Sequence, residues 1–249
     1  LPQDGRFAVR LKDGTVDVRI STLPAQYGES VVMRLLSQSA GMLDLDKIAM
    51  PKPMREALQR AIDKPSGLVL VTGPTGSGKT TTLYGALNTL NSTERKIITV
   101  EDPVEYRLPG LNQVQVHEKI DMTFERVLRS SLREDPDVIL VGEMRDKTTA
   151  EIGMRAAMTG HLVLSTLHTN DALSTPARLI DMGVPRWMVA MSLQLVVAQR
   201  LVRTLCPACA QPHVPTPQEE VWLKQMLGPE VDYSRLRRSK GCPDCNGVG

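Results

Sequence analysis

Residues 73–80 combine glycines, a lysine and a threonine at a spacing suited to phosphate binding. The segment is Gly73-Pro74-Thr75-Gly76-Ser77-Gly78-Lys79-Thr80, which fits the pattern G-x-x-x-x-G-K-[ST] in full. Glycines let successive backbone N–H groups turn toward one anion, and a following helix adds the partial positive charge of its N-terminus. Lys79 can reach terminal phosphates, and Thr80 can bind Mg²⁺ through its hydroxyl. The segment predicts an ATP-binding loop that continues into Thr81.

Polar side chains follow three apolar runs further along the chain. Run 97–100 is followed by Glu101, Asp102 and Glu105, run 138–141 by Glu143, and run 162–167 by His168. In open parallel sheets, ligands bind beyond the carboxyl ends of the strands. Each residue alone is also explained as a solvated loop residue. Their repetition at successive strand ends favours a site shared with the phosphate loop.

The chemistry of nucleotide hydrolysis suggests a role for each of these side chains. An acid at the end of an apolar strand helps to hold Mg²⁺, and here that acid is Glu143. A second carboxylate must orient or deprotonate the attacking water, and Glu105 and Glu101 are both candidates. His168 could sense or stabilise the γ-phosphate.

Four cysteines form two C-x-x-C pairs in the last fifth of the chain. They are Cys206, Cys209, Cys242 and Cys245. Two such pairs match the ligand set of a structural Zn²⁺ ion, in which four thiolates close the coordination shell. Redox-active cysteines are the alternative.

The remaining patterns indicate an α/β fold with a mainly parallel sheet. Continuous apolar runs at 68–71, 97–100, 138–141 and 162–164 are typical of strands buried on both faces. Helical spacing joins Phe124 to Leu132 and Trp187 to Val197, and further helices are expected at 54–62 and 218–227. Near the start, Asp13-Gly14 predicts a hairpin between strands 7–11 and 16–20, followed by a third strand at 31–36.

These patterns divide the sequence into four parts. We expect the end of a preceding domain at 1–37, a linker at 38–53, a nucleotide-binding α/β core at 54–205 and a zinc-binding insert at 206–249. Because the sequence starts at Leu1 without Met and ends abruptly at Gly249, we expect it to be a fragment of a longer protein.

The composition excludes several classes of function. Lys and Arg number 30 against 28 Asp and Glu, and aromatics are only 3%, so a strongly basic or base-stacking nucleic-acid binder is not expected. No apolar run approaches the length of a transmembrane helix, and the residues from Leu1 to Gly5 do not have the pattern of a signal peptide.

At the level of whole motifs, the sequence resembles the ATPases of bacterial type II secretion and type IV pilus assembly. The matching stretches are GPTGSGKT, ITVEDPVEYRL, DPDVILVGEMRD and TGHLVLSTLHTN. The stretches QYGESVVMRLL and EDPVEYRLP resemble the mannose-sensitive haemagglutinin pilus branch most. The similarity covers nearly the whole chain.

The resemblance implies roles for individual residues. It implies Glu105 as the water-activating residue, Glu143 as the Mg²⁺-binding acid, and His161 and His168 as a histidine motif with His168 nearer the nucleotide. It also implies that Arg19 and Arg34 approach nucleotide phosphates, whereas the residues alone favour half-exposed strand arginines. Arg145 and Arg178 are weaker candidates, for which surface ion pairing is the alternative.

The resemblance further implies a cytoplasmic, Mg²⁺-dependent ATPase whose core at 54–205 is a RecA-like motor domain and which forms a homohexameric ring. It would act on an inner-membrane platform protein to build a pilus or pseudopilus, and a zinc module would belong to assembly and secretion members. Two alternatives stay open: a pilus retraction ATPase, which would lack the cysteine insert, and a nucleic-acid translocase of related fold.

Overall fold

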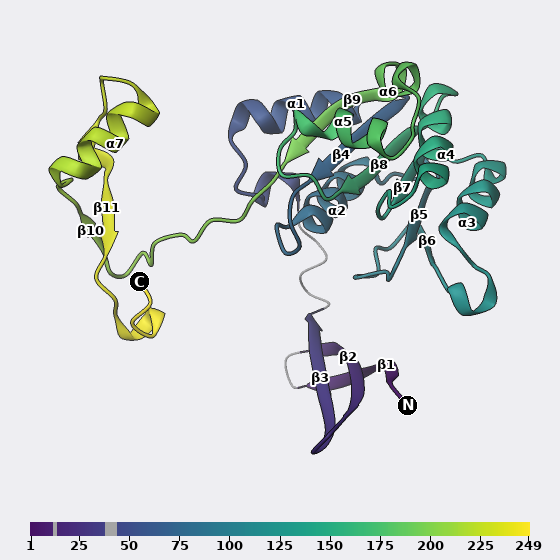
Figure 1. The fold of residues 1–249 in the computed structure, drawn as a ribbon, viewed down its shortest axis with the longest axis horizontal. Coiled ribbons are helices and arrows are strands. Elements are labelled where there is room, and N and C mark those ends of the chain that lie inside the picture. Colours follow the sequence, from purple (N-terminus) through teal and green to yellow (C-terminus); the bar gives the residue numbers. More distant parts are fainter. Residues whose placement is uncertain (12–13, 38–43) are drawn as a thin grey trace. The chain divides into compact units, whose positions relative to one another are not determined.

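A sheet of six parallel strands is the largest sheet of the structure, a computed structural model that describes residues 1–11, 14–37 and 44–249 (Figure 1). Its strands are β4 (Gly67–Thr72), β5 (Ile97–Glu101), β6 (Asn112–Gln115), β7 (Val138–Val141), β8 (Leu162–Leu167) and β9 (Leu193–Ala198). They lie in the order β6-β5-β7-β8-β4-β9, and each neighbouring pair is parallel. Because every strand runs the same way, their carboxyl ends meet at one edge of the sheet.

Helices cover both faces of this sheet. They are α1 (Lys52–Ile62), α2 (Lys79–Leu90), α3 (Phe124–Ser131), α4 (Lys147–Met158), α5 (Ser174–Asp181) and α6 (Arg186–Ser192). Alternate residues of β4 enter opposite cores, since successive side chains of a strand point to opposite faces. Val69 and Val71 pack with residues of α1 and α2, and Leu68 and Leu70 pack with residues of α4, α5 and α6.

The apolar runs that predicted buried strands are confirmed. Every residue of β4, β5, β7 and β8 is buried. Strands in the interior of a parallel sheet are covered on both faces, which explains why these segments are continuously apolar. The predicted α/β class with a mainly parallel sheet is therefore confirmed.

The predicted helix across Trp187 to Val197 is wrong in its second half. Helix α6 ends at Ser192, and β9 begins at Leu193 beside β4. The apolar residues of this segment fit helical spacing, but Leu195, Val196 and Val197 are also a run suited to a strand. The exposed edge of β4 offers this run a full set of backbone hydrogen bonds, so strand pairing overrides the local periodicity.

Other boundaries differ from the sequence prediction by a few residues. Helix α1 starts at Lys52 rather than Met54, and α3 ends at Ser131 before a short 3₁₀ turn, η4 (Leu132–Glu134). Strand β6, which was not predicted, contains no apolar run and lies at the edge of the sheet.

The first residues form a separate antiparallel sheet. Its strands are β1 (Gln3–Leu11), β2 (Gly14–Ala25) and β3 (Gly28–Ser37), in that order. Leu11 pairs with Gly14, as the predicted hairpin requires; Asp13 lies outside the described residues. Val18 is buried, whereas Val31, Met33 and Leu35 are exposed.

The chain divides into two compact units, Leu1–Arg200 and Leu201–Gly249. The second unit contains β10 (Ala210–Pro212), β11 (Arg237–Ser239) and α7 (Pro217–Leu227). Short 3₁₀ turns complete the described elements: η3 (Glu118–Ile120), η5 (Tyr233–Arg235) and η6 (Pro243–Cys245). Helix α7 begins with a capping box between Thr216 and Glu219.

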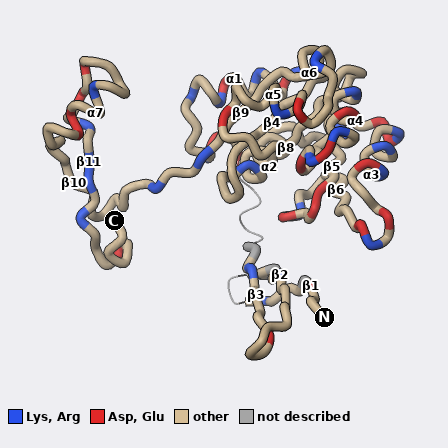
Figure 2. The backbone as a smooth tube through the Cα atoms, in the orientation of Figure 1, with Lys and Arg blue, Asp and Glu red and all other residues tan. Residues whose placement is uncertain are grey.

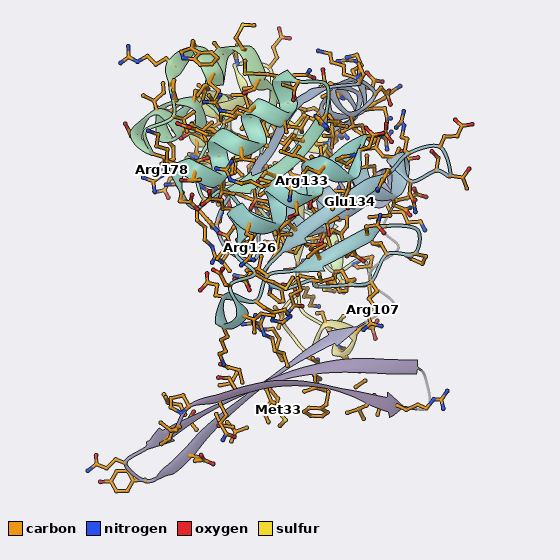
Figure 3. All side chains as sticks on the ribbon, turned by 90° about the vertical axis from the view of Figure 1, so that its right-hand side faces the viewer. Met33, Arg107, Arg126, Arg133, Glu134 and Arg178 are labelled. Atoms are coloured by element: carbon orange, nitrogen blue, oxygen red, sulfur yellow. The ribbon has the colours of Figure 1, made fainter. Side chains whose placement is uncertain are left out.

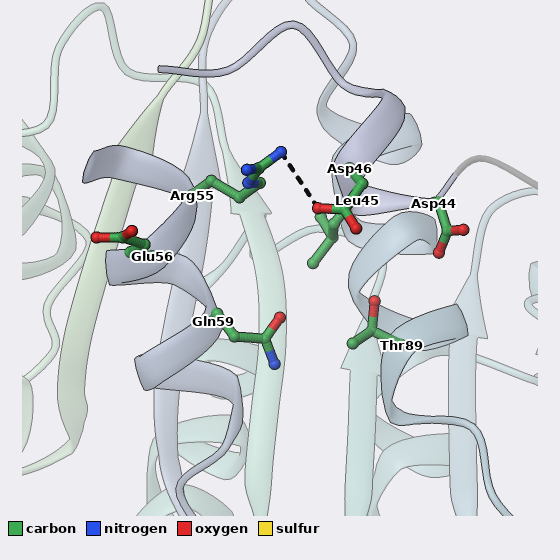
Figure 4. A pocket seen from close by; sticks show the side chains of 7 residues that line it. All are labelled: Asp44, Leu45, Asp46, Arg55, Glu56, Gln59 and Thr89. Carbon is green, nitrogen blue, oxygen red and sulfur yellow. Dashed lines mark ion pairs between the residues drawn. The ribbon is translucent and has the colours of Figure 1, made fainter. Parts of the chain in front are cut away.

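A short segment before α1 packs against the core of the first unit. Leu45, in the 3₁₀ turn η2 (Leu45–Lys47), is buried, and Asp46 forms an ion pair with Arg55 of α1 at 3.2 Å (Figure 4). These residues line a cavity of about 270 Å³ whose far wall includes Thr89 of α2 (Figure 4).

Positively and negatively charged residues are mixed along the chain. Separately, no helix among the described residues could cross a membrane. Lys and Arg positions interleave with Asp and Glu positions on the helices around the central sheet (Figure 2). The described helices are each too short or too polar to span a bilayer.

Shortening a side chain at the centre of the sheet should destabilise the first unit. Leu164 of β8 is fully buried, so Leu164→Ala should lower the free energy of unfolding by about 2–5 kcal/mol, measured by urea denaturation. Met191→Ala, at a position 71% exposed, is the control and should change it by less than about 0.5 kcal/mol. Equal effects of the two substitutions would contradict the assignment of Leu164 to the core.

Candidate nucleotide-binding site

The loop between β4 and α2 has a backbone that only glycine adopts readily. Gly73, Gly76 and Gly78 have φ angles of 143°, 77° and 84°, in the region that side chains disfavour. A Cβ at Gly73 would also clash with the carbonyl oxygen of Gln199 and lie 2.7 Å from Ser77 Oγ. The predicted phosphate loop therefore lies between a buried strand and a helix N-terminus, as anion binding requires.

Lys79 is the first residue of α2 and folds back over this loop. Its Nζ donates hydrogen bonds to the carbonyl oxygens of Gly73 and Pro74 at 2.9 and 3.0 Å. Partial burial lowers the pKa of Lys79, and the negative charge of Glu143 opposes that shift. The Lys79 ammonium group thus contacts the loop carbonyls and is near enough to Glu143 for the two charges to interact. Together with the neighbouring Thr80 hydroxyl, this donor set fits a nucleotide phosphate and a Mg²⁺ ion.

Gln199, which follows β9, supports the loop by hydrogen bonds to residues on either side of it. Gln199 donates its backbone N–H to the Thr72 carbonyl oxygen at 2.8 Å, and its side-chain oxygen accepts from Thr82 Oγ1 at 2.7 Å. Arg200 donates to the carbonyl oxygen of Asn170 at 3.0 Å. Sequence patterns missed Gln199, because its importance depends on the position of β9 beside β4.

Glu143 is the centre of a polar cluster at the carboxyl edge of the sheet. It follows β7 and forms an ion pair with Arg145, while His168 Nε2 lies 3.7 Å from its other carboxylate oxygen. Arg145 also contacts Asp102 at 3.5 Å. The expectation that polar residues from successive strand ends meet is thus met by Asp102, Glu143 and His168. These side chains retain contact with solvent, so a ligand can replace the contacts among them.

Glu101 and Glu105, the two candidates for activating water, occupy different environments. Glu101 is 4% exposed and accepts hydrogen bonds from Tyr84 and from Thr99 Oγ1. Burial raises the pKa of Glu101. Glu105 is half-buried in the loop between β5 and β6. The environment of Glu101 suits a structural role, which leaves Glu105 as the more accessible carboxylate.

His161 lies away from this cluster. His161 precedes β8, at the amino edge of the sheet, and its Nδ1 is 3.0 Å from the Ala156 carbonyl oxygen. His168 follows the opposite end of the same strand, so the two histidines cannot share one ligand. Arg178 is an exposed residue of α5 (labelled in Figure 3).

Arginines line up across the N-terminal sheet. Arg19 of β2 lies directly opposite Arg34 of β3, and Arg6 of β1 lies opposite Arg19. Like charges at opposed positions destabilise a sheet unless an anion compensates them. Sequence reasoning singled out Arg19 and Arg34 separately, and the register of β2 with β3 shows that they are directly paired.

The four predicted zinc ligands come together in the second unit. Their four sulfur atoms lie within 4.8 Å of one another. Cys206 Sγ is 3.9 Å from Cys242 Sγ, Cys209 Sγ is 3.9 Å from Cys245 Sγ, and Cys242 Sγ is 3.7 Å from Cys245 Sγ. Tetrahedral coordination with Zn–S bonds of about 2.3 Å places sulfurs about 3.8 Å apart, so the cluster fits Zn²⁺.

Backbone N–H groups point at the sulfur of Cys245. The amides of Cys242 and Gly249 donate to it at 3.2 and 3.1 Å. These donors and the neighbouring backbone lower the pKa of Cys245 to about 6. A tight turn makes this possible, since Gly241 has a φ of 85° and a Cβ there would approach the Gly247 carbonyl oxygen to 2.8 Å.

The sequence model of the type II/IV secretion system protein family matches residues 1–249. The type II secretion system protein E of Dickeya dadantii is 53% identical over 249 residues, covering 100% of this chain and 49% of that protein. The type IV pilus assembly ATPase PilB of Myxococcus xanthus is 50% identical over 251 residues, covering 100% of this chain and 44% of that protein. The chain thus spans about half the length of the curated relatives it matches. Assignment to the mannose-sensitive haemagglutinin branch stays a prediction.

Solved structures show the same fold. The crystal structure of the pilus retraction motor PilT with bound ADP superposes with a TM-score of 0.68 at 38% identity, covering 81% of this chain and 59% of that chain.

A side chain at Gly73 should lower the affinity for ATP, because its Cβ would clash with Gln199 in addition to straining the backbone. Gly73→Ala should weaken ATP binding at least about tenfold, because the new Cβ displaces Gln199 from the loop; equilibrium titration with a fluorescent ATP analogue measures this. Gly160→Ala is the matched control, because Gly160 also has a positive φ of 114° but nothing lies within 4 Å of its Cβ position. Equal affinities in the two variants would contradict the steric argument.

The cysteine cluster should carry one zinc ion per chain, measured by elemental analysis of the purified protein. Cys242→Ser should remove it, and chelation should unfold residues 201–249, which limited proteolysis would detect, because structural zinc contributes on the order of 10 kcal/mol. His213→Ala is the control: His213 lies in the same unit but pairs with Glu219 at 3.0 Å rather than with the sulfurs, so zinc content should not change. Zinc retained by Cys242→Ser would refute the ligand assignment.

Proposed function

Because the chain belongs to the type II/IV secretion system protein family, we propose that it is the ATP-hydrolysing part of a motor that assembles a type IV pilus or a type II secretion pseudopilus. The observation that carries this proposal is the glycine-rich loop at the end of β4, with Lys79 bonded to the loop carbonyls and near the charge of Glu143. Relatives named as secretion and pilus assembly ATPases, at 50% identity or more, support it.

Different residues of the site bind the phosphates, hold Mg²⁺ and activate water. The backbone of residues 73–80 and Lys79 hold the phosphates, while Thr80 and Glu143 hold Mg²⁺, which neutralises charge that develops on the phosphate oxygens. Glu105 accepts the proton of the attacking water. His168, 3.7 Å from Glu143, contacts the γ-phosphate side of the site and can report its loss.

A role in assembly is favoured over retraction. The chain is 50% identical to a pilus assembly ATPase but 38% identical to the solved retraction motor. The four-cysteine cluster is the additional feature expected of assembly and secretion members. A nucleic-acid translocase is disfavoured by the balanced charge and the scarcity of aromatic residues.

The parts of the chain serve this motor in different ways. Residues 1–37 end a preceding domain, 38–53 link it to the core at 54–205, and 206–249 form a zinc module. In a homohexameric, cytoplasmic ring, the Arg19 and Arg34 pair approaches nucleotide phosphates, since arginine neutralises transferred phosphoryl groups well. The ring passes its motion to an inner-membrane platform protein.

Replacing the proposed base should separate chemistry from binding. Glu105→Gln keeps the size of the side chain but cannot accept the proton, so kcat should fall by about 10²–10⁴-fold while the Kd for ATP changes by less than about threefold. Phosphate release and equilibrium nucleotide binding measure the two quantities. Hydrolysis at the parental rate would show that another group activates the water.

Lys79→Ala provides the contrasting variant. Removing a charged donor should weaken ATP binding by about 10–100-fold and also lower kcat. If this variant bound ATP normally, the loop at 73–80 would not be the phosphate site, whatever the outcome for Glu105.

A further inference from the structure

Tyr84 links the phosphate-loop helix to the strand that precedes Glu105. It lies in α2, about one and a half turns after Lys79, and is 3% exposed. Its hydroxyl donates to the carboxylate of Glu101, the last residue of β5. A buried carboxylate is costly unless several donors satisfy it, and the pattern of these donors indicates what Glu101 does.

Each donor to Glu101 comes from a different part of the site. Thr99 Oγ1, in the same strand, donates at 2.5 Å, and Gln113 Nε2, in the neighbouring strand β6, lies at 3.4 Å. Tyr84 contributes the donor from α2. Glu101 therefore ties β5, β6 and α2 together at one buried point.

The same groups hold the loop that carries Glu105. The backbone of Glu105 and Tyr106 lies beside the Tyr84 hydroxyl and opposes the rise in the pKa of Tyr84 that burial causes. Gln113 donates to the Tyr106 carbonyl oxygen at 2.9 Å and accepts from the Leu108 N–H at 2.7 Å. The rings of Tyr84 and Tyr106 meet edge to face, with centroids 5.7 Å apart.

We propose that Tyr84 and Glu101 are positioning residues that set the place of Glu105 relative to the phosphate loop. The segment between β5 and β6 has no helix or strand of its own, so its backbone depends on these side chains. Tyr84 and Lys79 belong to one rigid helix. The Tyr84 hydroxyl therefore fixes the base against the helix that holds the phosphates. This inference rests on the proposed function, in which Glu105 activates water.

Tyr84→Phe tests the link, because it removes one oxygen and keeps the packed ring. A misplaced base slows chemistry without weakening phosphate contacts, so kcat should fall by about 10–100-fold with the Kd for ATP unchanged within about threefold. Hydrogen exchange of the amides of Glu105 and Tyr106 should become faster. Gln113→Met removes the hydrogen bonds from β6 to Tyr106 and Leu108. It should also lower kcat and speed exchange while leaving the Kd for ATP unchanged.

Thr89→Val is the matched control for loss of a hydroxyl from α2. Thr89 Oγ1 bonds only within its helix, to the Gly85 carbonyl oxygen at 3.0 Å, and faces the cavity shown in Figure 4. This variant should retain the parental kcat, Kd and exchange rates.

The outcomes separate this inference from the proposed function. If Glu105→Gln lost the parental hydrolysis rate and Tyr84→Phe kept it, the positioning role of Tyr84 would be overturned. The proposed function would then still stand. An equal loss of kcat and ATP affinity in Tyr84→Phe would also overturn it, because general damage to the fold would explain the result. If the parent protein, made as the full chain, bound ATP without hydrolysing it, the proposed function would fail and this inference with it.

Discussion

Parallel pairing of β4 between β8 and β9 is the constraint on which the rest of the first unit depends. It buries a six-residue strand completely and releases the chain at its carboxyl end into a loop that must bend sharply into α2. The same direction of every strand brings the ends of β5, β7 and β8 to that edge. Once the sheet is parallel, acids and histidine that follow separate strands have to meet there.

The site uses carboxylates in two electrostatic environments. Glu143 remains in contact with water, and its partners Arg145 and His168 are more than half exposed. Such pairs contribute little to stability, so the cluster can rearrange around a ligand. Glu101 is buried and satisfied by several donors, an arrangement that resists movement. The Glu143 carboxylate can therefore exchange its partners for a ligand, whereas the Glu101 carboxylate holds the surrounding elements in place.

Sequence patterns predicted the parts of the structure whose causes are local. Glycine spacing gave the phosphate loop, continuous apolar runs gave the buried strands, and paired C-x-x-C turns gave the sulfur cluster. Sequence patterns failed where the secondary structure of a segment depends on pairing with a strand that is distant in the sequence. The segment after Ser192 becomes β9 because β4 offers an open edge, and polar Asn112–Gln115 becomes β6 for the same reason. Residue types alone left Glu101 and Glu105 as equal candidates, and the family resemblance favoured Glu105. Only the fold shows that Tyr84 reaches Glu101.

The brace formed by Gln199 has a consequence for how such proteins can exchange parts. Gln199 supports the phosphate loop through Thr72 and Thr82, and the second compact unit begins two residues later, at Leu201. Exchanging the cysteine-containing unit between relatives at a junction after Arg200 would therefore leave Gln199, and with it the support of the phosphate loop, unchanged. A junction slightly earlier would import a foreign residue into the support of the loop.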